Sequence, residues 1–295
     1  MRPDKATKMY NVSPPAPSLF DRFAKVIADI PMGKFWTDDY PDERLLIDTE
    51  PQRGVRIYYA PFDYVNKAAS IAIVGITPGK TQMLAALEEA KRQLAAGADF
   101  TASARAAKNH ASFSGPMRDR LVEQLDHFRI NEYLRLSTCA SLFTTHSHLA
   151  HFTSSLRYPV FVDKRKKGNP VLCENYTGSS PSIHNQSVLM RYLHSYFAAE
   201  LRTIPRAVIV PLGAAMHNVC RLLASSGHID PDRLLLGIEH PSGGSNGNSG
   251  YLMYPKPRGN YGMRSSIPFD RIDDNRQGLR DRIERLLSER HDMDE

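Results

Sequence analysis

Apolar and polar positions alternate along the chain in blocks that predict strands and helices in turn. Residues 69–76 (ASIAIVGI) and 207–212 (AVIVPL) are short, continuous apolar runs rich in β-branched side chains, which is typical of fully buried parallel strands. Residues 133–140 (YLRLSTCA) and 234–238 (LLLGI) are predicted to be two further strands. The pattern therefore predicts a sheet of four strands.

Apolar residues recur at helical spacing between these runs. Residues 81–96 combine strong helix formers with a closing glycine, and 273–290 are predicted to form a charged amphipathic helix that covers the surface. Because parallel strands need crossover connections that bury both faces of the sheet, the alternation favours the α/β class. We expect a three-layer αβα sandwich around a central, mostly parallel, four-stranded sheet. The other predicted helices are 20–30, 117–128, 187–201 and 213–225.

The chain is predicted to contain one folded domain preceded by an arm. Residues 1–18 contain four prolines and no periodic apolar face, so we expect a flexible N-terminal arm. A single domain is predicted over 19–290, with a short tail at 291–295. Residues 158–173 consist of two extended halves joined by a basic loop, and they are predicted to form an inserted hairpin.

Composition narrows the class of partner. The 295 residues include 38 Lys and Arg against 32 Asp and Glu, and the resulting formal charge of +6 favours a polyanionic partner without identifying it. No run approaches the roughly 20 apolar residues of a membrane span, so we expect a soluble, cytoplasmic protein that does not bind membranes. Cys139, Cys173 and Cys220 are too few for a four-cysteine site and too scattered for a disulfide framework. We expect reduced thiols, no metal and no cofactor.

Two polar, glycine-containing segments follow predicted strands, at the place where open α/β sheets bind ligands. Residues 75–82 (GITPGKTQ) turn from a strand into a helix whose first amides can meet an anion, and residues 240–248 (HPSGGSNGN) form a polar loop. The first segment does not fit a Walker loop, because its two glycines enclose three residues and that loop needs four. A nucleotide-dependent enzyme built on Lys80 and Thr81 stays open as a minor alternative.

These segments resemble two motifs of the uracil-DNA glycosylase superfamily. GITPG resembles the first active-site motif, especially the Gly-Ile-Asn-Pro-Gly form of the mismatch and thymine-DNA branches, and HPSGGS resembles the second. Residues 207–215 are similar to the third strand and turn of the family, and residues 113–125 (FSGPMRDRLVEQL) to its phenylalanine-glycine segment. The resemblance implies the fold of that family and a DNA glycosylase, which flips a base from DNA and hydrolyses its N-glycosidic bond to leave an abasic site.

The resemblance also implies a role for each matched residue. Thr77 and His240 match the catalytic positions, and His240 would donate a hydrogen bond to the pyrimidine O2, where negative charge develops. Phe113 matches the ring that stacks on the flipped base, although a buried core aromatic is equally consistent with its residue type. The predicted base pocket consists of Gly75, Ile76, Pro78, Phe113 and Thr138. The predicted DNA contacts are Gly79, Lys80, Ser242, Gly243, Gly244, Ser245, Asn246, Lys164, Arg165, Lys256 and Arg258, with Asn248 and the rest of the basic loop to Lys167 as further candidates.

Two positions depart from the family pattern. The first motif normally has Asp, Asn or Glu where this chain has Thr77. Threonine is a poor general base, because its hydroxyl cannot take up a proton from water near neutral pH. On the predicted strand 133–140, related branches carry a Thr-Asn pair where this chain has Ser137 and Thr138. The carboxylates that could assist in place of the missing one are Asp63, Glu174, Asp38 and Asp39.

The departures favour a base that is bulkier than uracil, because they remove the uracil-reading amide and open the second motif with two glycines. The resemblance thus implies a monofunctional, metal-free hydrolase for a modified pyrimidine. With its departures and the inserted hairpin, the chain resembles superfamily members that bacteria use against phages and that excise bulky modified cytosines such as glucosylated hydroxymethylcytosine. The implied setting is DNA repair or anti-phage defence, and no obligate protein partner is predicted. The alternative is a catalytically inactive module of the same fold that holds DNA or a flipped base.

Overall fold

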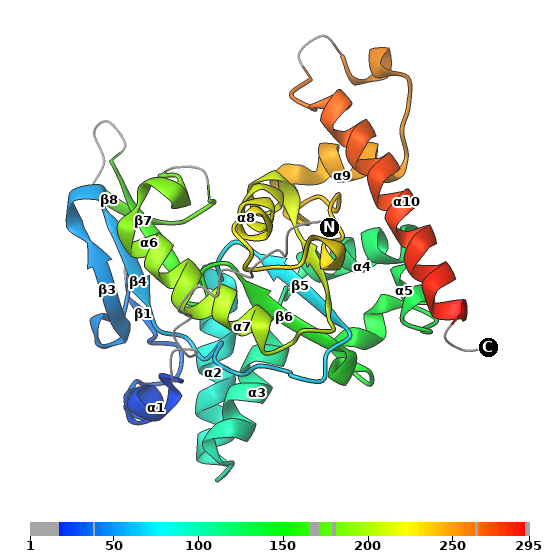
Figure 1. The fold of residues 1–295 in the computed structure, drawn as a ribbon. Helices are drawn as coiled ribbons and strands as arrows, with labels where there is room; N and C mark the ends of the chain where they lie inside the picture. The colour runs from blue at the N-terminus through cyan, green and yellow to red at the C-terminus, as the bar shows by residue number, and fades with distance from the viewer. Residues whose placement is uncertain (1–17, 38, 166–170, 179–180, 263–264, 293–295) are drawn as a thin grey trace, which may run out of the picture.

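The computed structural model describes residues 18–37, 39–165, 171–178, 181–262 and 265–292. The proposed N-terminal arm, apart from Ser18, lies outside these ranges, as do Asp38, Lys166, Lys167 and the last three residues of the proposed tail. In the described chain, strands and helices alternate around a central sheet (Figure 1). The structure is therefore of the mixed α/β class that the apolar pattern predicts.

A three-stranded parallel sheet in the order β6-β5-β9 lies at the centre. Its strands are β5 (Ile71–Gly75), β6 (Ala150–Ser154) and β9 (Val208–Pro211). Every residue of β5 and β9 is buried, so the two continuous apolar runs are confirmed as core strands. Since strands β6 and β9 flank β5 in parallel, all three carboxyl ends meet at one edge of the sheet.

Helices cover both faces of this sheet (Figure 1). Alternate side chains of β5 enter two separate cores, because successive residues of a strand point to opposite faces. Ala72 and Val74 pack in the core that contains α2 and α3, whereas Ile71 and Ile73 pack in the core that contains α4 and α10. The helices are α1 (Phe20–Asp29), α2 (Lys80–Ala95), α3 (Phe100–Ala111), α4 (Pro116–His127), α5 (Ile130–Tyr133), α6 (Ser187–Tyr192), α7 (Ala199–Arg202), α8 (Gly213–Ser225), α9 (Asn246–Met253) and α10 (Phe269–Asp292).

The parallel sheet of the described chain has three strands rather than the predicted four. The segment 234–238 lies beside β9 but forms a single bridge, between Ile209 and Leu234. Near its end, the N–H of Gly213 donates to the carbonyl of Ile238 at 2.8 Å. Between these contacts Gly237 has φ of +129°, a backbone angle that takes the chain out of strand geometry. The segment therefore occupies the fourth position without a continuous ladder.

The prediction of a strand at 133–140 is wrong. Helix α5 ends at Tyr133, and a 3-10 helix follows at Cys139–Phe143. Asp126, near the end of α4, holds this turn by accepting hydrogen bonds from the Thr138 hydroxyl at 2.6 Å and from the N–H of Cys139 at 2.7 Å. The remaining parallel strand is β6, which the apolar pattern missed because His151 interrupts it and is buried only through a partner distant in sequence.

A second, antiparallel sheet in the order β3-β4-β7-β8 packs beside the first. Its strands are β3 (Leu46–Glu50), β4 (Val55–Tyr58), β7 (Val160–Arg165) and β8 (Val171–Asn175), and a short ladder of β1 (Trp36–Thr37) with β2 (Tyr40–Pro41) precedes them. Strands β7 and β8 pair antiparallel across the segment for which a hairpin was predicted. The end of β8 brings Asn175 to the edge where the parallel strands end.

Candidate active site

A cavity of about 510 Å³ lies at the carboxyl ends of the parallel strands. Its volume falls within the range of roughly 300–1,000 Å³ that is usual for small-molecule sites. Both predicted motifs contribute to its wall, which brings together segments that are more than 150 residues apart in the sequence. The predicted site residues that line it are Gly75, Ile76, Thr77, Pro78, Gly79, Phe113, His240, Ser242, Ser245 and Asn248.

The first motif turns directly from β5 into α2, and protein side chains cap the first amides of that helix. The N–H of Gly79 donates to Gln82 Oε1 at 3.1 Å, and the N–H of Lys80 donates to Asn175 Oδ1 at 2.9 Å. A Cβ atom at Gly79 would lie 3.1 Å from the Gln82 oxygen, so glycine permits the close turn. Because Asn175 occupies the helix N-terminus, these amides are not free to hold a nucleotide phosphate as in a Walker loop.

The Thr77 hydroxyl is engaged in holding the hairpin. It donates to the carbonyl of Tyr158 at 2.9 Å and accepts from the N–H of Val160 at 3.0 Å. A hydroxyl has a single proton, and here that proton is already donated to a backbone carbonyl. Thr77 therefore fixes the start of β7 against the first motif, and its oxygen keeps one acceptor position for a water but is not a base that could take its proton.

His240 is a neutral, half-buried ring on the cavity wall. Burial lowers the pKa of His240 below its ordinary value of 6.5, with the nearby Glu239 opposing that shift. Its Nδ1 accepts a hydrogen bond from the N–H of Ser242 at 3.2 Å, which assigns the single ring proton to Nε2. His240 therefore presents one hydrogen-bond donor, and its orientation is set by the loop that follows it.

Gly213 determines how closely His240 approaches β9. Gly213 begins α8 with φ of +79°, and a Cβ atom there would lie 3.0 Å from Cβ of His240. Glycine adopts this φ without strain and has no side chain to collide. The turn from β9 into α8 therefore sets the position of the ring.

Phe113 lies over the first motif. A Cβ atom at Gly75 would lie 3.7 Å from the Phe113 ring, and the ring packs edge-on against Phe152 with centroids 6.0 Å apart. Phe113 is half-buried and has φ of +51°, which is rare for a residue with a large side chain. The ring lines the cavity rather than filling the core.

Sequence reasoning missed the buried carboxylate of Glu239, which directly precedes the second motif. Glu239 lines the cavity, and its Oε1 pairs with Arg271 of α10 at 2.6 Å. Asn248 donates to its other oxygen at 3.3 Å, and Gln124 bonds both the N–H and the carbonyl of its backbone. The position beside His240 was a signal in the sequence, but the partners come from distant helices.

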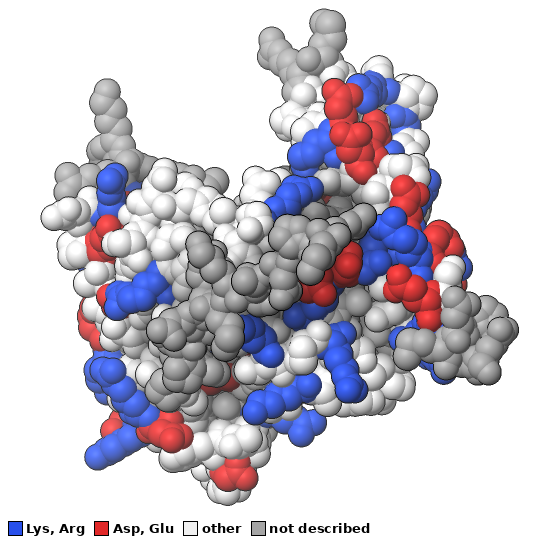
Figure 2. Space-filling view, viewed as in Figure 1, with Lys and Arg blue, Asp and Glu red and all other residues white. Residues whose placement is uncertain are grey.

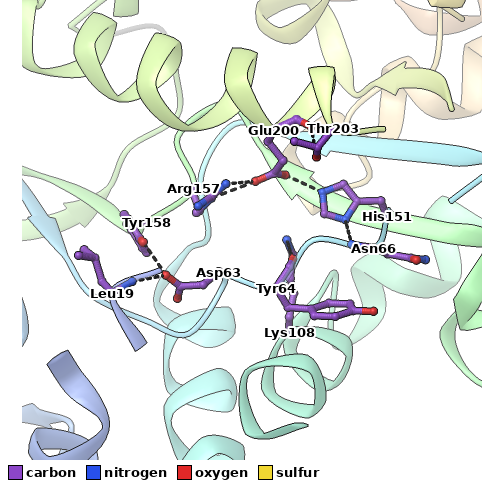
Figure 3. A network of polar contacts seen from close by, with 10 residues as sticks. All are labelled: Leu19, Asp63, Tyr64, Asn66, Lys108, His151, Arg157, Tyr158, Glu200 and Thr203. Atoms are coloured by element: carbon purple, nitrogen blue, oxygen red, sulfur yellow. Dashed lines mark hydrogen bonds and ion pairs between the residues drawn. The ribbon is translucent and has the colours of Figure 1, made fainter. Parts of the chain in front are cut away.

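Sequence reasoning also missed two buried cations on the β6 side of the cavity, Lys108 and Arg157 (Figure 3). Lys108 donates to the carbonyl of Tyr64 at 2.6 Å, and burial lowers its pKa to about 8. Arg157 pairs with Glu200, which also lies 2.6 Å from His151 Nε2. Glu200 does not line the cavity, so the charges on the cavity wall at this end are positive.

The remaining predicted residues lie elsewhere in the described structure. Thr138 caps the 3-10 helix described above and does not line the cavity, because the strand that was predicted to carry it does not exist. At the carboxyl end of the actual strand, β6, Thr153 and Ser154 line the cavity instead. Gly243, Gly244 and Asn246 follow the second motif into a 3-10 turn and α9, where they do not line the cavity.

The predicted basic contacts are partly neutralised by neighbours. Lys164 pairs with Glu174 at 2.8 Å, and Arg258 pairs with Asp270 and Asp273. Figure 2 shows acidic and basic side chains side by side over α10. Lys80 lies 4.0 Å from the centroid of the Trp36 ring. Lys256 is exposed, and the side chain of Arg165 lies outside the described part of the structure.

The candidate carboxylates do not reach the cavity. Asp63 is buried and accepts hydrogen bonds from Leu19, Tyr59 and Tyr158, and neither Glu174 nor Asp39 lines the cavity wall. Of the acidic residues in the described chain, only Glu239 does. No cluster of three or more potential metal ligands occurs among the described residues. No helix within those same ranges is long and apolar enough to cross a membrane.

Fold and site together define an α/β protein with a cavity at the carboxyl edge of its parallel sheet. No protein-family model matches the chain. YoxB of Bacillus subtilis (strain 168), an uncharacterized protein, is 36% identical over 189 residues, which are 63% of this chain and 70% of YoxB. The chain therefore belongs to the same family as YoxB.

The crystal structure of wild-type SMUG2 from Pedobacter heparinus aligns with 94% of this chain and 98% of its own, at 12% identity and a TM-score of 0.36. A TM-score this low does not establish a common fold.

Proposed function

We propose that the protein is a DNA glycosylase of the uracil-DNA glycosylase superfamily, which hydrolyses the N-glycosidic bond of a flipped base. The observation that carries this proposal is His240, a neutral ring with one donor, facing the same cavity as the Phe113 ring. An aromatic surface and a fixed donor are what a flipped base needs for stacking and edge recognition. The two segments that resemble motifs of the family, 75–82 and 240–248, both contribute to the wall of this cavity, which supports the proposal.

In the proposed reaction, the bond between the base and C1′ breaks and its electron pair leaves with the base. Negative charge then develops on the pyrimidine O2, where the Nε2–H of His240 stabilises it. The carboxylate of Glu239, held by Arg271, stabilises the positive charge that develops on the sugar. A water oxygen bonds to C1′, and the proton that it loses ends on the released base.

This route needs little from Thr77. Its hydroxyl is committed to Tyr158 and Val160, so charge stabilisation by His240 and Glu239 has to supply most of the rate. In this proposal Ser242 and Ser245, which line the cavity, contact the phosphates that flank the flipped nucleotide. The same observation at Thr77 favours the second candidate function, a module that binds DNA or a flipped base without cleaving it.

The proposed substrate is a modified pyrimidine, with glucosylated hydroxymethylcytosine of phage DNA as the leading candidate and anti-phage defence as the setting. The cavity volume of about 510 Å³ supports a base larger than a bare pyrimidine. A nucleotide-dependent enzyme is not proposed, because the side chain of Asn175 occupies the helix N-terminus at Lys80.

The test is base release from DNA that contains one uracil, thymine mismatch, hydroxymethylcytosine or glucosylated hydroxymethylcytosine, scored by strand breakage after alkali. We expect cleavage of at least one substrate, and a rate lower by about 10²–10³ in His240→Ala, which removes the donor. His228→Ala is the matched control, since that ring packs against His194 outside the cavity. Binding without release from any of these DNAs would favour the non-catalytic module.

A further inference from the structure

The cavity extends across the whole parallel sheet, from His240 on one side to Lys108 and Arg157 on the other. The strand order is β6-β5-β9, and the segment that leads to His240 lies beyond β9. Arg157 follows β6, and Lys108 belongs to the same buried network as His151 of that strand (Figure 3). Three inter-strand spacings, about 14 Å, therefore separate the two backbone segments.

Within the described ranges, Lys108 makes one hydrogen bond. A lysine ammonium has three N–H groups, and the carbonyl of Tyr64 is the hydrogen-bond partner of Lys108 among the described residues. The Lys108 side chain is 2% exposed and lies on the cavity wall, and no carboxylate of the described residues forms an ion pair with it. A buried ammonium with unused donors is costly unless a ligand supplies acceptors.

Arg157 adds a second positive charge at the same end. Its partner Glu200 does not line the cavity. One carboxylate oxygen of Glu200 bonds to Arg157 and the other to His151. Burial, together with the Lys108 charge, lowers the pKa of His151, so this ring is neutral near pH 7. The cavity end thus exposes donors and positive charge, which suits oxygen acceptors.

The pyrimidine ring connects the two ends of the cavity. Its C2 and C5 atoms lie directly opposite each other across the ring. A ring whose O2 meets His240 and whose C2–C5 axis runs along the sheet therefore directs C5 toward Lys108 and Arg157. We infer that Lys108 and Arg157 form a subsite for an oxygen-rich substituent at C5 of the flipped pyrimidine, with Lys108 Nζ as the contacting donor. This inference rests on the proposed base-flipping site and names the group that the site reads.

The first test varies the substituent and leaves the protein intact at Lys108. Affinity is measured by fluorescence anisotropy with His240 left in place, for DNA with one 5-methylcytosine, 5-hydroxymethylcytosine or glucosylated hydroxymethylcytosine. The sugar of that nucleotide carries a 2′-fluorine, which suppresses bond breakage during the measurement. The methyl group occupies the same position without an acceptor. We expect the glucosylated DNA to bind about tenfold more tightly than the methylated DNA, which corresponds to one gained charge-assisted hydrogen bond.

The second test removes the donor. Lys108→Met keeps the length of the side chain, and we expect it to reduce that preference by about tenfold. Lys91→Met is the matched control, because Lys91 also donates to backbone carbonyls but lies on α2 away from the cavity wall. Equal affinity for the methylated and glucosylated DNA would overturn the subsite, as would an unchanged preference in Lys108→Met.

Base release by the wild-type protein separates this inference from the proposed function. Release that does not depend on the C5 substituent, with no preference in binding, removes the subsite and leaves the glycosylase. If binding depends on the C5 substituent but no DNA releases a base, the proposed glycosylase activity is wrong. The protein is then a non-catalytic module that recognises the C5 substituent.

Discussion

The protonation state of His240 is the residue-scale feature on which the proposed reaction depends. Burial keeps its pKa below 6.5, and the N–H of Ser242 occupies Nδ1. Protonation would place a second proton on Nδ1, against that donor, and would disturb the loop that orients the ring. We expect the rate of base release to stay constant from pH 8 down to about 6.5 and to fall at lower pH. A rate that rises as the pH falls below 6.5 would identify the charged ring as the active form.

Thr77 leads to a prediction about stability rather than rate. Thr77→Val removes the hydroxyl that bridges Tyr158 and Val160, and it leaves the N–H of Val160 without a partner. The expected loss is about 1–3 kcal/mol in the free energy of unfolding, measured in urea. Thr144→Val, whose exposed hydroxyl makes only a 3.5 Å contact with Ser141, should change it by less than about 0.5 kcal/mol. Equal effects of the two changes would show that the hairpin does not depend on Thr77.

At the scale of elements, the turn from β9 into α8 positions the His240 ring. Gly213→Ala would combine a strained φ with a Cβ atom 3.0 Å from Cβ of His240, so we expect lower stability and a displaced ring. Gly227→Ala is a close control, because Gly227 has φ of +73° and its added Cβ would meet nothing within 4 Å. We expect Gly213→Ala to reduce base release by at least about tenfold. Circular dichroism would establish that both variants fold.

The elements also show where sequence patterns succeed. Strands β5 and β9 are continuous apolar runs, and α8 begins at the predicted Gly213, because both signals are local to the chain. Strand β6 was missed and 133–140 was mistaken for it. An apolar count cannot distinguish a buried histidine with a distant carboxylate partner from a surface residue, nor foresee that Asp126 would hold a turn at Thr138.

At the scale of the whole molecule, Glu200 links β6, α3 and the segment after β6 through buried charges. Burial alone would raise its pKa, but Arg157, Lys108 and His151 outweigh that effect and hold the pKa well below 4.5. Glu200→Gln would leave Arg157 buried without a counter-charge, and we expect a loss of about 3–5 kcal/mol in the free energy of unfolding. Glu132→Gln is the control. It removes an exposed ion pair with Arg129 and should change the free energy of unfolding very little.

The pH dependence of this contribution to stability follows from the direction of the pKa shift of Glu200. A carboxyl group with a depressed pKa in the folded state stabilises the fold above its unfolded pKa near 4.5 and ceases to do so as the pH falls through the folded value. The difference in the free energy of unfolding between wild type and Glu200→Gln, measured in urea, should therefore have its largest value at pH 7 and decrease below pH 4.5. A difference that stays constant into strong acid would show that Glu200 acts through packing and not through its charge.

The sequence alone determined the α/β class, two of the three parallel strands and the two motif segments that follow them, because burial of a strand and the turn after it are recorded in neighbouring residues. Tertiary structure decided the rest of the site. Glu239 with Arg271, and Lys108 with Arg157, line one cavity only because helices and strands far apart in the chain meet at one sheet edge. The hydrogen bonds of the Thr77 hydroxyl are also tertiary, because its partners, the carbonyl of Tyr158 and the N–H of Val160, lie about 80 residues further along the chain. Local pattern fixes which segments are buried, whereas the pairing of polar groups depends on contacts that only the folded chain brings together.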